Sequence, residues 1–434
     1  MTKISTSQVA VDSRAVKSTD LFIALPGNQT DGHLFLHEVK EKGVKKAIIR
    51  ADFSGTIPEG LEVIRVPDTL QALQNMAKER MKQASGKVLA LTGSVGKTTT
   101  KEFIRTLSEA QWKTFATEGN QNSQVGLSQT IVNNVKGDED VLIIEMGMTN
   151  RGHIKKLMQI APPDIALITQ VALMHPVLFE DGLEGIAKAK AEIFSHPRTK
   201  LGLINLDTEY TQLLFQTGFF PKKSFSSQGN KQADLLLEIG EKSLVFIEKG
   251  KKIEAPKPNF PVRHVYDNLL AAVAAVRALD MPWEILIKTI GTLKLPERRL
   301  ELIRKGSVDC INDSYNAGEM SMKSGLDYLG SFKPRRRVAI LGQMRELGRF
   351  SAECHRRVGQ HALERADVLL CLGEECGPLV EVWKQAKRPV EWAMTFDQLK
   401  DIVAKNVQKD DVLLLKGSRS NGMWRVLELL EGCI

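Results

Sequence analysis

The chain has 434 residues, roughly three times the length of a typical domain, so we expect two or three domains, each with its own core. Apolar residues make up 42% and charged residues 26%, as in soluble globular proteins, which excludes a disordered chain. No apolar stretch approaches the ~20 residues that span a bilayer, and the polar N-terminal segment lacks the apolar core of a secretory signal. We therefore expect a cytoplasmic protein without membrane insertion.

The formal net charge of +8 favours anionic partners but does not separate nucleotides from nucleic acid. The densest basic run, 335–337, follows Pro334 and precedes an apolar segment, which is typical of a solvated loop, so we expect no nucleic-acid partner. The cysteines include no C-x-x-C pair, and we expect reduced thiols at Cys310, Cys354, Cys371, Cys376 and Cys433.

The first 85 residues hold short apolar segments at 21–25, 46–50 and 61–66 and one helical pattern at 69–84. They predict a small α/β N-terminal domain over 1–85. This domain is the first of three in our division of the chain.

A central P-loop-type domain is predicted over 86–295. Its strands alternate with helices, which favours a parallel sheet covered on both faces, and lie at 87–92, 140–146, 165–170 and 201–205. The segment 220–262 is richer in Pro, Lys and Ser, and we expect peripheral hairpins there. Two helices, at 267–278 and 282–291, end the domain.

The same alternation restarts after the break KLPERR (294–299). It predicts a C-terminal Rossmann-like α/β domain over 296–434. Helices are expected from 321, at 351–366 and at the end of the chain, and strands at 308–313, 337–341, 367–372 and 411–416.

A glycine-rich segment, TGSVGKTT (92–99), stands between a predicted strand and a predicted helix, as a phosphate-binding loop requires. Glycines let backbone N–H groups approach phosphates, the helix N-terminus attracts anions, Lys97 adds positive charge and the Thr98 hydroxyl suits Mg²⁺. The general pattern expects a glycine where Leu91 stands, so a helix-capping turn remains an alternative. We expect ATP to bind at Gly93, Ser94, Val95, Gly96, Lys97, Thr98 and Thr99.

Three other residues are candidates for catalysis. Glu145 ends an apolar strand, and an acid there points into the crevice where ligands bind to parallel sheets; the alternative is a solvated acid. His175 and Lys190 have simpler readings from the residues alone, as a packing histidine and an exposed helix lysine. The segment 230–233 lacks the aspartate that recognises guanine, which favours ATP over GTP.

These motifs together resemble the Mur ligase family over nearly the whole chain. The resemblance rests on short ordered segments at 12–14, 20–25, 31–33, 92–102, 118–126, 145–147, 168–175, 187–194, 311–317, 341–348 and 416–419. It implies an ATP-dependent ligase that joins the carboxylate of a UDP-N-acetylmuramoyl tripeptide to the amine of D-alanyl-D-alanine through an acyl phosphate. A monomer is expected.

The resemblance also implies roles for individual residues. Lys97, Glu145, His175 and Lys190 would be catalytic, with Mg²⁺ at two sites formed by Thr98, Glu145, His175 and a carbamylated Lys190. Nucleotide contacts are implied for Asn268, Arg298, Asp313 and Asn316. Substrate contacts are implied for Asn120 and Asn122, for Ser13, Arg14 and His33 at the UDP end, and for Lys416, Ser418 and Arg419 at the dipeptide carboxylate.

Some residues depart from the family pattern and put substrate fit in question: Ser123, Gln170, Glu297, Gln343 and Arg345. The rival readings are a sibling ligase that adds a single amino acid and a folylpolyglutamate synthetase. A more remote rival is a P-loop ATPase that binds nucleic acid, which predicts a basic stripe with interleaved aromatics. Aromatic residues make up only 6% of the chain, which argues against it.

Overall fold

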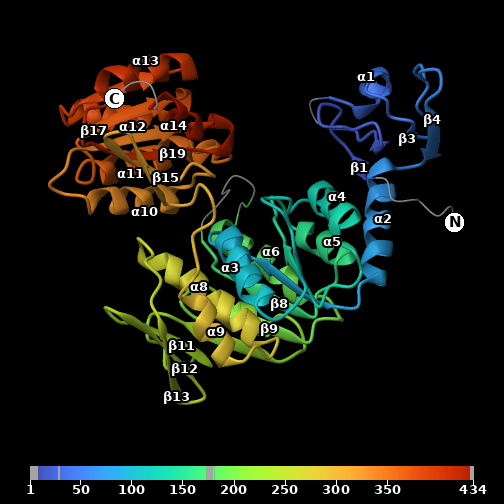
Figure 1. Ribbon diagram of the computed structural model, residues 1–434, viewed down its shortest axis with the longest axis horizontal. Coiled ribbons are helices and arrows are strands. Elements are labelled where there is room, and N and C mark those ends of the chain that lie inside the picture. Colours follow the sequence, from blue (N-terminus) through green and yellow to red (C-terminus); the bar gives the residue numbers. More distant parts are fainter. Residues whose placement is uncertain (1–7, 28–29, 173–178, 180, 431–434) are drawn as a thin grey trace.

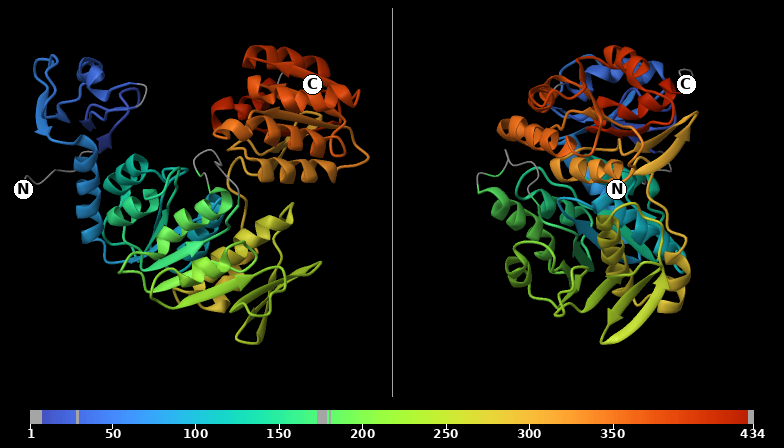
Figure 2. Two further views of the ribbon diagram at one scale, coloured as in Figure 1. Left: turned by 180° about the vertical axis from the view of Figure 1, so that it is seen from behind. Right: turned by 90° about the vertical axis from the view of Figure 1, so that its left-hand side faces the viewer.

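Three separate β-sheets, each with its own helices, follow one another along the chain (Figure 1). The computed structural model describes residues 8–27, 30–172, 179 and 181–430. Figure 2 shows the first and third sheets standing apart at opposite ends of the central part. The predicted α/β class, with parallel-rich sheets in three parts, is confirmed.

The first sheet is four-stranded, entirely parallel and ordered β1-β2-β3-β4. The sequence patterns did not predict the two-residue β1 or the short α1 (Leu36–Glu41). The strands are β1 (Val9–Ala10), β2 (Leu21–Ile23), β3 (Lys46–Arg50) and β4 (Glu62–Val66).

Helix α2 (Thr69–Gln83) joins the first sheet to the central part. Asp68 caps it by accepting a hydrogen bond from the Gln71 amide at 2.9 Å. Leu73 packs with the first sheet, whereas Ala77 and Met81, four and eight residues later on the same face, belong to a core of the central part. In Figure 1 the helix lies beside α4 and α5. Because α2 contributes to the cores of both parts, a domain boundary at residue 85 stays a prediction.

The central sheet has nine strands in the order β13-β12-β11-β10-β9-β8-β5-β7-β6. Its strands from β5 to β11 pair in parallel, and the last two are antiparallel. Their bounds are β5 (Lys87–Thr92), β6 (Thr114–Ala116), β7 (Val141–Glu145), β8 (Ile165–Ile168), β9 (Leu201–Asn205), β10 (Lys222–Ser226), β11 (Leu235–Ile239), β12 (Ser243–Glu248) and β13 (Lys251–Pro256).

The prediction of peripheral hairpins at 220–262 was correct in part, because β11, β12 and β13 form antiparallel hairpins at one edge of the central sheet. β10 pairs in parallel with β9, and β11 with β10, so this segment extends the central sheet. Parallel pairing joins residues far apart in sequence, and no local pattern in the segment reveals it.

Both faces of the central sheet are covered, which explains the unbroken apolar run in β5. Leu89 and Leu91 face one core, and Val88 and Ala90 face the other. The first core is covered by α3 (Lys97–Glu109), α8 (Arg263–Arg277) and α9 (Trp283–Ile290), and the second by α4 (Gln124–Asn134), α5 (His153–Ile160), α6 (Gly182–Ala191) and α7 (Thr211–Gln216).

The third sheet has the order β14-β15-β19-β16-β17-β18, parallel except for β14. The sequence patterns did not predict the helices and the strand between 377 and 406. The strands are β14 (Glu301–Lys305), β15 (Val308–Asn312), β16 (Arg337–Gly342), β17 (Val368–Leu372), β18 (Val390–Ala393) and β19 (Val412–Lys416). The helices are α10 (Glu319–Gly330), α11 (Ser351–Ala362), α12 (Gly377–Gln385), α13 (Phe396–Asn406) and α14 (Val426–Leu429).

None of the helices in the described part of the chain combines the length and apolar character needed to cross a membrane. The four cysteines within the described ranges, Cys310, Cys354, Cys371 and Cys376, are buried free thiols. Cys433 lies outside the described residues.

Candidate active site

The strand order of the central sheet brings three loops together at one edge. β5 lies between β8 and β7, so the chain continues on one side of β5 and then on the other. The segments that follow these three parallel strands meet where the strand order reverses. Ligands of open α/β sheets bind at such points. A cavity of 1070 Å³ lies there, between the central part and the loops of the third sheet.

The glycine-rich segment after β5 forms a tight loop that leads directly into α3. Gly96 has φ +83°, and a Cβ at this position would lie 2.1 Å from Asn268 Oδ1, so both its conformation and its surroundings require glycine. The segment after β8 braces the loop from outside, because Thr169 Oγ1 donates a hydrogen bond to the Val95 carbonyl at 2.8 Å. Ser94 Oγ donates another to the Ala172 carbonyl at 2.7 Å.

Lys97, the first residue of α3, folds back over the loop. Its Nζ donates a hydrogen bond to the Gly93 carbonyl oxygen at 2.8 Å. Burial lowers the pKa of the Lys97 amine; the Glu145 carboxylate opposes this shift and the Arg299 guanidinium adds to it. Lys97, Thr98 and Thr99 all line the cavity with the loop, as a triphosphate-binding site requires.

Glu145 ends β7 inside the cavity with 1% of its surface exposed. Its Oε1 accepts a hydrogen bond from Asn122 Nδ2 at 2.8 Å. Its Oε2 is buried and accepts no hydrogen bond from any residue that the structure describes, and the Lys101 ammonium lies 3.7 Å away. Since a buried carboxylate oxygen is costly without a partner, Glu145 is the right donor for a cation beside the phosphates.

The residues present fit a magnesium ion of the nucleotide type. Thr98 follows Lys97 in the first turn of α3 and offers its hydroxyl oxygen. Glu145 offers the carboxylate oxygen Oε2, which accepts no hydrogen bond from the described residues. No cluster of three or more His, Cys, Asp or Glu side chains suits a metal within the described ranges. Magnesium that binds with few protein ligands and with phosphate oxygens needs no such cluster.

Lys190 on α6 is buried, with 4% of its surface exposed. Burial lowers the pKa of its amine well below the usual value, and the nearby charge of Lys97 adds to the effect. The neighbouring Lys188 is half exposed and pairs with Glu184 at 2.7 Å. Burial thus favours Lys190 over Lys188 as the reactive lysine. The predicted His175 lies outside the described residues.

The third sheet supplies the opposite wall of the cavity. Asp313 and Asn316 line it after β15, and Asn268 lines the central side. Lys416 is fully buried, and its Nζ binds Asp313 Oδ2 at 2.6 Å and the Asn316 carbonyl at 3.1 Å. These contacts engage Lys416 within its own domain, where it holds Asp313 in place. Lys416 also lines the cavity, and its contact with a dipeptide carboxylate stays a prediction.

Arg299, not the predicted Arg298, points into the cavity. Arg298 has φ +60°, and its guanidinium lies over the Trp424 ring at 4.5 Å. Arg299 lines the cavity and stacks on Tyr315 at 4.2 Å. Burial raises the pKa of the Tyr315 hydroxyl, which also faces the cavity. The sequence does not indicate which of two adjacent arginines faces the cavity. In the structure the left-handed backbone at Arg298 turns Arg299 towards it.

The segment 118–122 connects the central part to the third sheet. Arg419 donates a hydrogen bond to Asn120 Oδ1 across the cavity. Ser418 Oγ accepts a hydrogen bond from the Arg345 amide at 2.8 Å, and the Arg345 guanidinium pairs with Glu375 at 3.2 Å. Ser418, Arg419 and Arg345 therefore form one rim of the cavity.

The residues expected at the UDP end are engaged within the first domain. His33 is buried, its Nδ1 pairs with Asp31 at 2.5 Å, and its Nε2 accepts a hydrogen bond from the Arg50 amide at 2.9 Å. Ser13 Oγ donates to Glu38 at 3.2 Å. Arg14 is exposed but binds Asp12 through two nitrogens and lowers the pKa of that carboxyl to about 2. Both ring nitrogens of His33 thus have partners within the first domain, which fits a structural role for this histidine.

Side-chain contacts explain two of the departures from the family pattern, Ser123 and Gln343. Ser123 caps α4 by accepting a hydrogen bond from the Gly126 amide at 3.2 Å. Gln170 supports the phosphate loop only through its backbone carbonyl oxygen, which accepts from the Ser94 amide at 2.7 Å, so this bond does not explain the side chain. Gln343 accepts from the Glu375 amide at 3.3 Å. Glu297 lies beside Arg298 at 3.3 Å, and nothing in the structure explains it.

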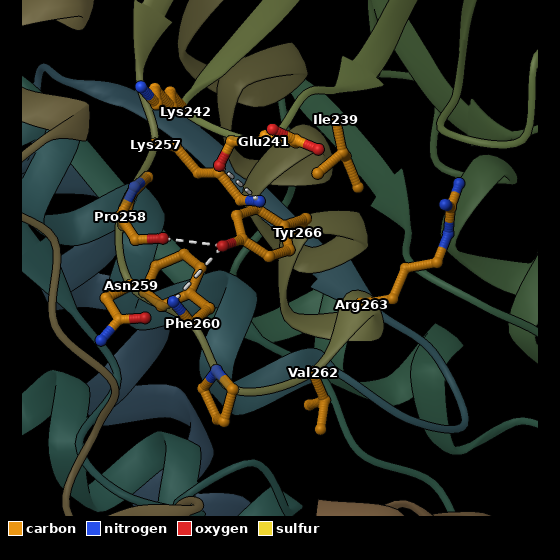
Figure 3. Close-up of a pocket in the computed structure, with 11 residues that line it drawn as sticks. Ile239, Glu241, Lys242, Lys257, Pro258, Asn259, Phe260, Val262, Arg263 and Tyr266 are labelled. Carbon is orange, nitrogen blue, oxygen red and sulfur yellow. Dashed lines mark hydrogen bonds between the residues drawn. The ribbon is translucent and has the colours of Figure 1, made fainter. Parts of the chain in front are cut away.

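A smaller cavity of 430 Å³ lies on the flank of the central part, between the β11–β12 turn and the start of α8. Hydrogen bonds engage its lysine and its tyrosine, as Figure 3 shows: Lys257 donates to the Glu241 carbonyl at 3.3 Å, and the Tyr266 hydroxyl donates to the Pro258 carbonyl at 2.7 Å. We assign it a structural role.

Known proteins match the chain from end to end. Three family models match it in order: "Mur ligase family, catalytic domain" over 5–81, "Mur ligase middle domain" over 91–276 and "Mur ligase, glutamate ligase domain" over 298–419. The UDP-N-acetylmuramoyl-tripeptide--D-alanyl-D-alanine ligase of Treponema pallidum is 32% identical over 98% of this chain and 93% of its own.

Solved structures agree with these matches. MurF from Acinetobacter baumannii has a TM-score of 0.83 at 26% identity, over 99% of this chain and 95% of its own. The MurF ligase from Thermotoga maritima in complex with ADP has a TM-score of 0.79 at 27% identity, over 99% of this chain and 98% of its own. The three family models match in order, and the relatives and solved structures match over nearly the whole chain. The chain belongs to the Mur ligase family.

Proposed function

We propose that this chain uses ATP to join D-alanyl-D-alanine to the free carboxylate of UDP-N-acetylmuramoyl-tripeptide, a late step in making the peptidoglycan precursor. The observation that carries the proposal is the cavity, where a phosphate loop, a buried carboxylate and three arginines of the third domain meet. The names of the full-length relatives supply the substrates.

The chemical problem is that a carboxylate is a poor electrophile. Transfer of the ATP γ-phosphoryl group forms a bond from the carboxylate oxygen to phosphorus and breaks the bond to ADP, which gives an acyl phosphate. The dipeptide amine then attacks the acyl carbon, phosphate leaves, and the amine loses a proton. Because anions meet in the first step, positioning and neutralisation of charge supply most of the catalysis.

The residues of the cavity divide this work. The loop amides and Lys97 hold the β- and γ-phosphates, Asn268 holds the adenine side, and Arg299 with Asp313 and Asn316 approaches from the third domain. Magnesium bound at Thr98 and Glu145 would neutralise the phosphate oxygens. Asn122 orients Glu145 through its 2.8 Å hydrogen bond.

We propose in addition that Lys190 is carbamylated and, with His175, helps to hold a second magnesium ion. Carbon dioxide adds only to a neutral amine, forming an N–C bond and releasing a proton. Burial and the charge of Lys97 lower the pKa of the Lys190 amine, which supports this chemistry at neutral pH. The enzyme is further proposed to act in the cytoplasm as a monomer.

Phosphate release tests the function directly. The assay contains ATP, magnesium, a UDP-N-acetylmuramoyl tripeptide and D-alanyl-D-alanine, each omitted in turn. Turnover should require all of them, and single amino acids should not replace the dipeptide. Turnover with glutamate or another single amino acid alone would instead assign the chain to a sibling ligase or a folylpolyglutamate synthetase.

A further inference from the structure

Lys101, one turn after Lys97 on α3, has a completely buried side chain. Its Nζ donates a hydrogen bond to the Gly119 carbonyl oxygen at 2.8 Å. It lies 3.3 Å from Glu102 Oε1 and 3.7 Å from Glu145 Oε2. A buried ammonium is tolerated only beside oxygen partners such as these, so Lys101 is fixed in position.

The backbone that Lys101 grips belongs to the segment 118–122, which reaches both walls of the cavity. Asn122 in this segment binds Glu145 Oε1 at 2.8 Å, and its carbonyl accepts from the Gly147 amide at 2.9 Å. Asn120, two residues earlier, accepts a hydrogen bond from Arg419 of the third domain. One short segment therefore touches the carboxylate of the proposed metal site and the domain on the other side.

We propose that Lys101 is a positioning residue that couples Glu145 to the third domain. Its ammonium holds the Gly119 carbonyl, so Asn122 keeps the Glu145 carboxylate aimed into the cavity and Asn120 stays within reach of Arg419. It also balances the buried charge of Glu145 before a cation arrives. Lys97 lines the cavity, whereas Lys101 is buried behind Glu145, so it acts through its neighbours and touches no substrate. The proposal rests on the proposed function.

Lys101→Met tests the coupling, because methionine fills a similar volume without the charge. We expect kcat to fall at least tenfold, while the affinity for the β,γ-methylene analogue of ATP, measured by titration calorimetry with magnesium, changes less than threefold. In solution scattering, the analogue with magnesium should contract the wild type but not the variant. Lys101→Arg, which restores the charge, should recover part of both losses.

The matched control is Lys113→Met, at an exposed lysine on the same part of the molecule that pairs with Asp138. It should leave kcat and contraction unchanged. If Lys101→Met does not fold, Asn120→Ala cuts the same connection without touching a buried charge and should keep analogue affinity while losing contraction.

Three outcomes would overturn the proposal: an unchanged kcat in Lys101→Met, analogue affinity that falls in proportion to kcat, or contraction that is the same in variant and wild type, including none in both. Failure of the proposed function is distinguishable, because the wild type would then show no turnover with the tripeptide and dipeptide, while analogue binding and scattering still compare the variants.

Discussion

Glu145 and Asp313 are buried carboxylates that line the cavity together with several basic side chains. Lys101 and Lys190 are buried, and Lys97 lines the same cavity. Burial lowers the pKa of the Lys97 and Lys190 amines, and the charge of Lys97 adds to the shift of Lys190. The basic side chains suit a site that receives a triphosphate and a carboxylate. At the scale of the residue, the cavity is organised for anions before any substrate arrives.

Lys190→Ala should lower turnover by roughly 100-fold, as loss of one preorganised charged group does. Short carboxylic acids such as formate should restore part of it by supplying the missing anion. Since the pKa of the amine is lowered, wild-type activity at neutral pH should also fall in CO₂-free buffer and return with bicarbonate. Phosphate release measures all three effects.

Lys188→Ala is the control for this experiment, because Lys188 sits on the same helix but is exposed and paired with Glu184. It should keep wild-type turnover. If formate fails to rescue Lys190→Ala, the carbamate is wrong while the ligase assignment stands.

Arg299→Ala and Arg298→Ala separate two adjacent residues with different surroundings. Arg299 faces the cavity near Lys97, so its loss should raise the KM for ATP and lower kcat, together by roughly 100-fold in kcat/KM. Arg298 packs on Trp424, so its loss should cost less than about tenfold, mainly through packing. Steady-state kinetics with varied ATP decides; equal losses would contradict the inward placement of Arg299.

At the scale of the element, the phosphate loop is shaped by α8 as much as by its own sequence. Gly96 opens α3 with a left-handed backbone and lies against Asn268 of α8, and Thr100 on the next turn contacts the same side chain at 3.4 Å. The loop and Asn268 of α8 are therefore packed directly against each other.

Gly96→Ala should abolish detectable binding of the ATP analogue, because its Cβ would meet Asn268 Oδ1 at 2.1 Å and its φ of +83° is strained for alanine. Gly152→Ala isolates the second effect. Gly152 precedes α5 with φ +79° and open space around it, so alanine there should cost about 1–2 kcal/mol of stability and no affinity. Calorimetry and thermal unfolding measure the two; similar affinities in both variants would refute the contact argument.

A partly buried ion-pair cluster joins α10 to α11. Glu319 accepts from Arg357 Nε at 2.8 Å and from Lys323 at 2.7 Å. Despite desolvation, which acts to raise it, these bonds lower the pKa of Glu319 from 4.5 to about 2. The carboxylate therefore stabilises the third domain fully above about pH 4.5, and this contribution is lost as the pH falls towards 2.

Glu319→Gln should destabilise the third domain by about 2 kcal/mol at pH 7, allowing for screening by solvent, and by less at pH 3. Glu353→Gln, at the more exposed partner of Arg357, should cost little at either pH. Urea unfolding at the two pH values gives the comparison. A loss for Glu319→Gln that does not depend on pH would show that the ion pair is not its cause.

At the scale of the whole molecule, the third domain meets the central part through few polar contacts. Arg419 reaches Asn120, and Ser324 on α10 contacts His264 on α8 at 3.0 Å. The connecting segment includes two non-glycine residues with left-handed backbone, Arg298 at φ +60° and Leu300 at φ +49°. Such a sparse interface suits a domain that closes over substrate.

Arg419→Ala removes one of these contacts without disturbing a core. We expect kcat/KM for the dipeptide to fall roughly tenfold, through poorer closure, while the melting temperature stays within about 1 °C, because exposed polar contacts add little stability. Arg356→Ala, on the surface of α11, should change neither quantity. Unchanged kinetics in Arg419→Ala would remove this contact from the mechanism.

The sequence predicted what local patterns can encode. The apolar run of β5 and the glycines after it placed the phosphate loop, and the resemblance added Glu145 and Lys190. Partners farther along the chain decided the rest: Lys416 is engaged by Asp313, the Nε2 of His33 by the Arg50 amide, and β10 by β9. Lys101 looked like any lysine of an amphipathic helix, because only the folded segment 118–122 covers it.

The shared helix α2 limits how the molecule can be divided in the laboratory. A fragment cut to begin at residue 86 would lose Ala77 and Met81 and leave bare the apolar surface that they cover beside Leu127 and Ile131. Such a truncation invites aggregation. Anyone wishing to express the nucleotide-binding part by itself should start upstream of Asp68 and replace Leu73, whose apolar contacts lie in the removed sheet.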